Sequence, residues 1–103
     1  MEAWADFVER LAAIPEGDGT LLDNCLVLGH SDVSFAKIHG ITGLPMMIAG
    51  RASGALEPGV HVAGAASPTT RVGLTIQQVM GLTTESWGVR SMEATQPLSE
   101  ILV

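Results

Sequence analysis

Two short apolar runs constrain the fold of this chain more than any other feature. Residues 25–29 read Cys-Leu-Val-Leu-Gly and residues 45–50 read Pro-Met-Met-Ile-Ala-Gly, and neither run alternates apolar with polar side chains. A strand with one face in water shows that alternation, whereas a strand covered on both faces is apolar throughout, as in a parallel sheet. The two runs therefore predict two doubly covered strands.

Helices are expected on either side of these strands because apolar side chains recur there at helical spacing. The first apolar stripe consists of Trp4, Phe7, Val8, Leu11 and Ile14, before Pro15, and the second of Val72, Ile76, Val79 and Met80, before Gly81. Residues 65–68 should lead into the second helix, with Ser67 or Thr69 as its cap. Shorter elements are expected as a turn at 16–20, helical turns at 21–24 and 97–102, and an edge strand at 61–63.

This order of elements is typical of the α/β class, and we expect a partial, mostly parallel sheet with flanking helices in a single domain spanning residues 1–103. The core should be aliphatic, because 47% of the residues are hydrophobic and only 4% are aromatic. Two helices are too few to cover both faces of a parallel sheet and protect its edges. The chain is therefore expected either to dimerise through its sheet or to be an incomplete part of a larger α/β domain.

Charge and composition argue against several classes of partner. The net charge is -6 and the five basic residues are scattered singly, so no basic stripe is available for nucleic acid. The apolar runs are too short to span a membrane. Acidic residues occupy the start of the chain, where a signal peptide would carry positive charge. The single cysteine, Cys25, cannot form an internal disulfide and is interpreted as a small buried hydrophobe.

The best candidate for a functional site is the segment 30–44, which joins the two expected strands. It holds His30, Asp32 and His39, and imidazole and carboxylate groups suit a divalent cation such as zinc. Asp32 could instead cap a turn, and His39 could be a solvated loop residue. Ser31 and Ser34 lack the sequence context of a nucleophile elbow, and His61 is interpreted as a structural histidine.

The motifs of the chain, taken in order, resemble the C-terminal part of an uncharacterised exported bacterial family, the domain of unknown function 1552. The resemblance rests on residues 15–28, on Ser31-Asp32, on residues 44–50 and on residues 56–62 with Pro58-Gly59 and His61. It continues through residues 70–75, Met80-Gly81 and Ser86-Trp87-Gly88. Together these motifs cover nearly the whole chain.

That family is similar to the alkaline phosphatase and sulfatase-like hydrolases, in which a Ser-Asp-His-Gly stretch supplies metal ligands. The resemblance implies an exported or periplasmic protein and a ligand role for Asp32. Val33 and Ser34 stand where the His and Gly would be, so one ligand is lost unless His39 replaces it by folding back. The nucleophile and the remaining carboxylates of such enzymes lie on earlier strands and are not among these residues.

Three interpretations follow from these observations. The first is a C-terminal fragment or shortened relative of such a family member, without catalytic activity of its own and associated with the rest of the parent protein. The second is a self-contained non-catalytic module that homodimerises through its sheet and binds a small ligand near residues 30–44. The third is part of a metal-dependent phosphate- or sulfate-ester hydrolase.

Overall fold

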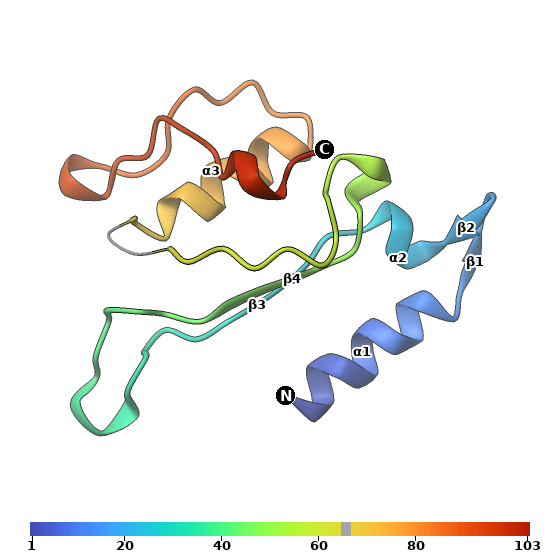
Figure 1. The fold of residues 1–103 in the computed structure, drawn as a ribbon, viewed down its shortest axis with the longest axis horizontal. Helices are drawn as coiled ribbons and strands as arrows, with labels where there is room; N and C mark the ends of the chain where they lie inside the picture. Colours follow the sequence, from blue (N-terminus) through green and yellow to red (C-terminus); the bar gives the residue numbers. More distant parts are fainter. Residues whose placement is uncertain (65–66) are drawn as a thin grey trace.

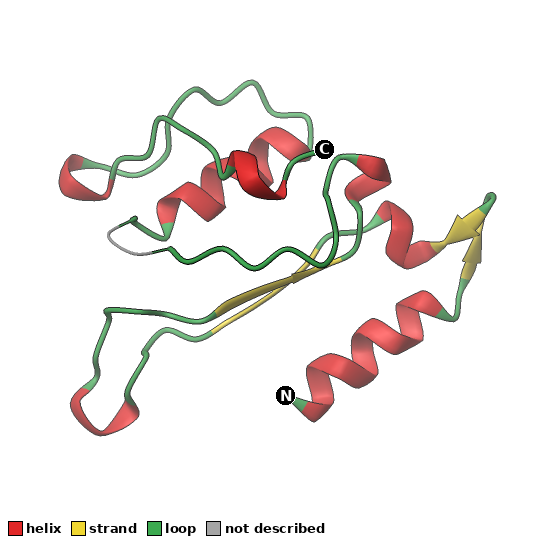
Figure 2. Ribbon diagram, viewed as in Figure 1, coloured by secondary structure: helices red, strands yellow, loops and turns green. Residues whose placement is uncertain are grey.

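The computed structural model describes residues 1–64 and 67–103 of the chain, and it contains helices, short 3-10 helices and two small sheets (Figure 1, Figure 2). In chain order the elements are α1 (Glu2–Ala12), β1 (Pro15–Glu16), β2 (Gly19–Thr20), α2 (Leu21–Asn24), β3 (Val27–His30), η1 (Ala36–Ile38), β4 (Met46–Ala49), η2 (Ala52–Gly54), α3 (Thr70–Val79), η3 (Arg90–Met92) and η4 (Ser99–Ile101).

The expected parallel sheet is wrong. The two apolar runs do form strands, β3 and β4, but they pair antiparallel, with Val27 opposite Ala49 and His30 opposite Met46. The other sheet, β1 with β2, is a second antiparallel pair. Within the described residues the protein is a small mixed structure of helices and two-stranded antiparallel sheets, and the mostly parallel α/β class does not apply.

The connection between the two strands explains this direction. Parallel neighbours need a crossover, usually a helix, whereas antiparallel neighbours can be joined by a simple reversal of the chain. Residues 30–44 carry no helical periodicity, and they fold back on themselves: the Ser34 N–H donates to the Gly40 carbonyl at 2.7 Å, and a bridge joins Phe35 to Gly40. The segment is therefore the extended end of a long hairpin, here called the hairpin tip (residues 31–44), which projects from the rest of the chain in Figure 1.

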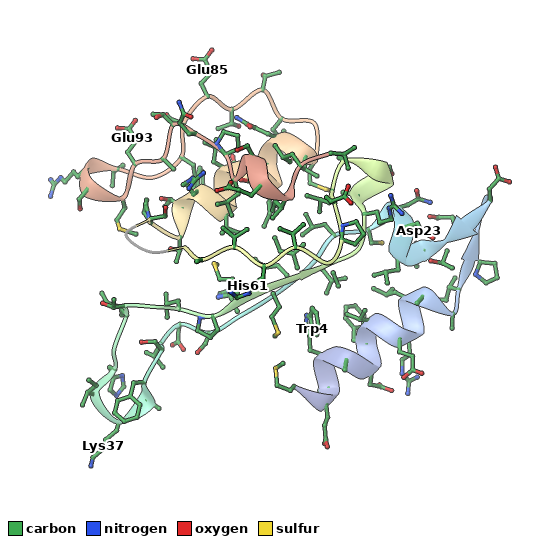
Figure 3. All side chains as sticks on the ribbon, viewed as in Figure 1. Trp4, Asp23, Lys37, His61, Glu85 and Glu93 are labelled. Atoms are coloured by element: carbon green, nitrogen blue, oxygen red, sulfur yellow. The ribbon has the colours of Figure 1, made fainter. Side chains whose placement is uncertain are left out.

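The strands lack alternation because different parts of the chain cover the two faces of the hairpin. Neighbouring residues of a strand point to opposite faces. Gly29 faces the indole of Trp4 from α1, and a Cβ placed at Gly29 would lie 2.8 Å from the Trp4 Nε1 atom. Figure 3 shows Trp4 rising from α1 toward the hairpin. Leu28 and Met46 lie on the other face, toward α3.

A carboxylate caps the short helix α2, which precedes β3 in the chain. The Asp23 side chain accepts hydrogen bonds from the N–H and the hydroxyl of Thr20, at 2.8 and 2.9 Å. These bonds, the backbone one first, lower the pKa of Asp23 below its ordinary value of 3.8. The Ala52 N–H donates to the Cys25 carbonyl at 2.9 Å, which ties the end of α2 to the chain leaving β4.

The most deeply buried side chains gather around α3 and the C-terminal segment. Leu74 and Thr75 of α3 are 0% and 1% exposed. The Thr75 hydroxyl donates to the Arg71 carbonyl at 2.7 Å and accepts the Leu98 N–H at 2.8 Å. Arg71 extends this attachment, because its guanidinium donates to the Pro97 carbonyl at 2.9 Å. The C-terminal segment is thus held along one side of α3.

Local sequence signals located most of the other elements correctly. The helices expected at 4–14 and 72–80, the helical turns expected at 21–24 and 97–102, and the turn at 16–20 are confirmed as α1, α3, α2, η4 and the β1–β2 turn. The edge strand expected at 61–63 is wrong, since those residues have no strand partner. The expected lead into α3 begins at residues 65 and 66, which lie outside the described residues. Across the described part of the chain, every helix is too short or too polar to cross a bilayer.

Replacing Thr75 by valine tests the attachment of the C-terminal segment. Valine preserves the shape of the side chain but leaves the buried Leu98 N–H without its acceptor, so the free energy of unfolding should fall by about 1–3 kcal/mol. Urea unfolding measures this loss. The exposed Thr42→Val provides the matched control and should change little. Equal midpoints for the two variants would contradict the role of Thr75.

The lowered pKa of Asp23 predicts a pH-dependent stability. A carboxyl whose pKa is depressed by folding stabilises the folded chain above its ordinary value of 3.8, and this contribution is lost as the pH falls through the depressed value. Asp23→Asn should therefore be less stable than the wild type at neutral pH. This difference in stability should shrink as the pH falls below 3.8 and through the depressed pKa of Asp23. Urea midpoints over a pH series measure this, with Asp18→Asn as a control of equal charge. A difference that is constant with pH would contradict the prediction.

Candidate functional site

A hollow of about 300 Å³ lies between the hairpin and the N-terminal half of α3. One wall comes from the end of β3 and the start of β4, the second from α3, and the third from the single side chain of Trp87. This volume is at the lower end of the range for small-molecule sites in proteins. The hollow is therefore the candidate functional site of the described residues.

The hairpin supplies the polar part of the hollow. His30 ends β3 opposite Met46, and Ser31 and Asp32 follow it along the wall. The Ser31 hydroxyl accepts the Val33 N–H at 3.3 Å, which forms a local turn around Asp32. Leu28 adds an apolar side chain to the same wall.

Helix α3 contributes one continuous face to the hollow. Thr70, Gly73 and Ile76 are three residues apart, so they lie above one another on the helix, with Val72 beside them. This face offers methyl groups, backbone and two hydroxyls, on Thr69 at the start of the helix and on Thr70, and the Thr70 hydroxyl donates to the Met92 carbonyl. The α3 wall is thus mainly apolar.

Trp87 closes the hollow and rests directly on the glycine of α3. A Cβ placed at Gly73 would lie 3.0 Å from two atoms of the Trp87 ring, so a larger residue at position 73 would push the indole away. The backbone of Trp87 is fixed by two hydrogen bonds with the buried Ala94, at 2.9 and 2.7 Å. Gly88 has φ +93°, and a Cβ there would lie 2.3 Å from the Met92 carbonyl oxygen. Half of the Trp87 surface remains exposed.

The structure brings together two of the three residues expected to bind metal. His30 and Asp32 both line the hollow, whereas His39 ends η1 in a left-handed conformation, φ 50°, within the hairpin tip. Lys37, two residues before His39, points away from the body in Figure 3. In residues 1–64 and 67–103, no three His, Cys, Asp or Glu side chains are grouped so that they could hold a metal ion. His30, Asp32 and His39 are thus not grouped as a three-ligand centre, and metal binding by them stays a prediction.

The remaining polar candidates have structural partners or lie elsewhere. The Ser34 hydroxyl donates to the Gly40 carbonyl at 3.0 Å, so it stabilises the hairpin tip. Cys25 is half-buried and forms no disulfide. His61 is exposed in the segment that follows η2, and it is labelled in Figure 3.

Sequence reasoning missed the side of the hollow made by Thr70, Gly73 and Trp87. The sequence features that belong to this side of the hollow are the motifs at 70–75 and 86–88. They are far apart in the chain and meet only in the folded structure. A tryptophan followed by glycine, and a glycine within an otherwise good helix, are the features that could have indicated a ring seated on a helix.

Comparison of the chain with protein-family models, with curated proteins and with solved structures found no match in any of the three. The resemblance to the domain of unknown function 1552 therefore stays a prediction that rests on the motifs alone.

Zinc titration tests the separation of His39 from the hollow. Because the three expected ligands do not converge, zinc in modest excess over protein should leave the melting temperature of the wild-type chain unchanged, and Asp32→Ala and His39→Ala should behave in the same way. Differential scanning calorimetry with and without chelator measures this. A zinc-dependent rise that is lost in both variants would show that the hairpin tip folds back to build a site, contrary to this structure.

Proposed function

We propose that this chain is a non-catalytic structural element whose apolar surfaces are completed by further protein. The observation that carries the proposal is the small number of buried apolar side chains set against many exposed ones. The resemblance to the domain of unknown function 1552 supports a parent protein of that family as the source of the covering surface. By the same resemblance, we propose that the protein is exported and works in the periplasm.

The exposed apolar side chains fall on several elements. In the described residues the buried hydrophobic side chains are Ala52, Leu56, Leu74, Ala94 and Leu98. The large exposed ones are Met1, Phe7, Ile14, Phe35, Ile38, Ile41, Val60, Met80, Leu82, Trp87, Val89, Met92 and Val103. Single exposed apolar residues are common in any protein, but grouped ones mark surfaces that contact other molecules. Here most of them fall in three segments, residues 1–14, the hairpin tip and residues 80–92.

The size of the surface leads to the same conclusion. The accessible surface is 7224 Å², whereas a compact protein of 10.7 kDa exposes about 5,500 Å². The radius of gyration, 14.7 Å, likewise exceeds the value of about 13 Å expected for a compact chain of this length. The excess area is large enough to accommodate an extensive permanent interface.

A second candidate function is favoured by the open edges of the hairpin. β3 and β4 form a two-stranded sheet, so each strand has one edge without a strand partner among the described residues. Isolated two-stranded sheets are marginally stable, and unpaired edges are templates for pairing with another chain. A module that homodimerises edge to edge would satisfy these groups and would also cover part of the excess surface.

The behaviour of the purified chain distinguishes the two candidates. If further protein is needed, the chain alone should bind the dye ANS and associate progressively as its concentration rises, as measured by fluorescence and light scattering. A discrete dimer that survives dilution would favour the second candidate over the first. A monomer that melts cooperatively and binds no dye would contradict both.

Polar substitutions in the hairpin tip provide the matched test. Ile38 and Ile41 are 71% and 76% exposed, so Ile38→Gln with Ile41→Gln should reduce dye binding and association without lowering the melting temperature. Thr42→Gln in the same segment is the control and should leave dye binding unchanged. A fall in melting temperature would show that these isoleucines stabilise the chain itself, contrary to the proposal.

A further inference from the structure

We infer that the hollow between the hairpin and α3 binds a small organic cation, an alkylammonium group with an apolar tail. The inference rests on the chemistry of the hollow and not on the proposed function. Trp87 also belongs to the exposed segment 80–92, so the covering protein proposed above would have to leave its ring accessible. Three features carry the inference: the charge of the lining, the apolar walls and the seating of Trp87.

The charge of the residues that line the hollow favours a positively charged ligand. Asp32 carries the only formal charge among the residues that line the hollow, and no lysine or arginine lines it. In the described part of the chain, no side chain donates a hydrogen bond to the Asp32 carboxylate, and none forms an ion pair with it. The nearby cation of α3, Arg71, is engaged with Pro97 and Glu100. The net charge of -6 adds to the attraction for a positive ligand.

The apolar side chains that line the hollow favour a cation that carries a hydrocarbon chain. Leu28, Met46, Val72 and Ile76 come from both sides of the hollow and present hydrocarbon. Small-molecule sites combine such walls with a few polar groups that orient the ligand. A short alkyl chain would lie along these side chains and gain from the removal of its surface from water.

Trp87 supplies the second group that recognises positive charge. Tryptophan is the aromatic residue that attracts cations most strongly through its ring face. One side of the indole rests on Gly73, its backbone is fixed by Ala94, and half of its surface is exposed. The ring is therefore held in place before a ligand arrives, so little ordering is needed on binding. The carboxylate and the fixed indole line the same hollow, so both recognise the ammonium group while the alkyl chain lies along the apolar side chains.

Titration with butylammonium, at constant ionic strength and neutral pH, tests this inference. Two-dimensional NMR resolves the indole N–H signals of the two tryptophans, Trp4 and Trp87, and Trp4→Phe assigns them. Butylammonium should shift the Trp87 signal saturably and leave the Trp4 signal in place. Uncharged butanol and anionic butyrate, which share the alkyl chain, should give at most a weak, non-saturating shift.

Two substitutions of equal charge separate a specific contact from general electrostatics. Asp32→Asn should weaken butylammonium binding by about tenfold, the loss of one charge-assisted contact. Asp18→Asn, in the turn between β1 and β2, removes the same charge and should bind as the wild type does. Spectra that overlay away from the hollow confirm that both variants are folded. The inference is overturned if butanol binds as well as butylammonium, if the two variants weaken binding equally, or if no saturable shift occurs.

Discussion

The antiparallel pairing of β3 with β4 is the interaction on which the other parts of the structure depend. α1 reaches the hairpin through Trp4 at Gly29, and α3 faces the opposite side across the hollow. The two strands also meet at their open end, where Gly50 has φ +98° and a Cβ would lie 2.2 Å from the Cys25 carbonyl oxygen. Only glycine permits that approach, so the hairpin closes where the chain leaves it for η2.

Local patterns predicted the positions of the elements, whereas the direction of the strands could not be predicted in the same way. The stripe from Trp4 to Ile14 and the stop at Pro15 are properties of neighbouring residues, and α1 follows them. The absence of alternation in β3 and β4 predicted two covered faces, and the structure bears this out only in part, because the strand residues are half-buried and His30 is exposed. This absence does not report strand direction, because any strand covered on both faces reads as apolar throughout. The evidence for reversal lay in the connecting segment, which lacks helical periodicity.

In the candidate site, too, the residues next to a strand were predicted from the sequence, whereas contacts between distant segments were not. His30 and Asp32 were predicted as site residues because they directly follow a strand, and both line the hollow. The contribution of Trp87 and Gly73 was missed, because the glycines beside Trp87 and within α3 are separate local signals, and neither shows that the two motifs meet in the folded chain. His39 was grouped with His30 by sequence proximity, but it follows η1 within the hairpin tip and does not line the hollow.

The hairpin tip has two parts with different surroundings. Ser31, Asp32 and Leu44, next to the strands, line the hollow, whereas Ile38 and Ile41 lie further out and are exposed. The tip is fixed by polar bonds such as those between Ser34 and Gly40, while Ile38 and Ile41 remain in water. Ordering these residues costs conformational entropy that their own burial does not offset, and the covering surface proposed above would supply the missing gain. α1 lies on the Gly29 face of the hairpin and the hollow lies on the Leu28 face. A proposed partner that covers α1 and the Ile38–Ile41 end of the tip, but not Asp32 or Trp87, would leave the hollow open to a small cation, so association and ligand binding can be tested separately.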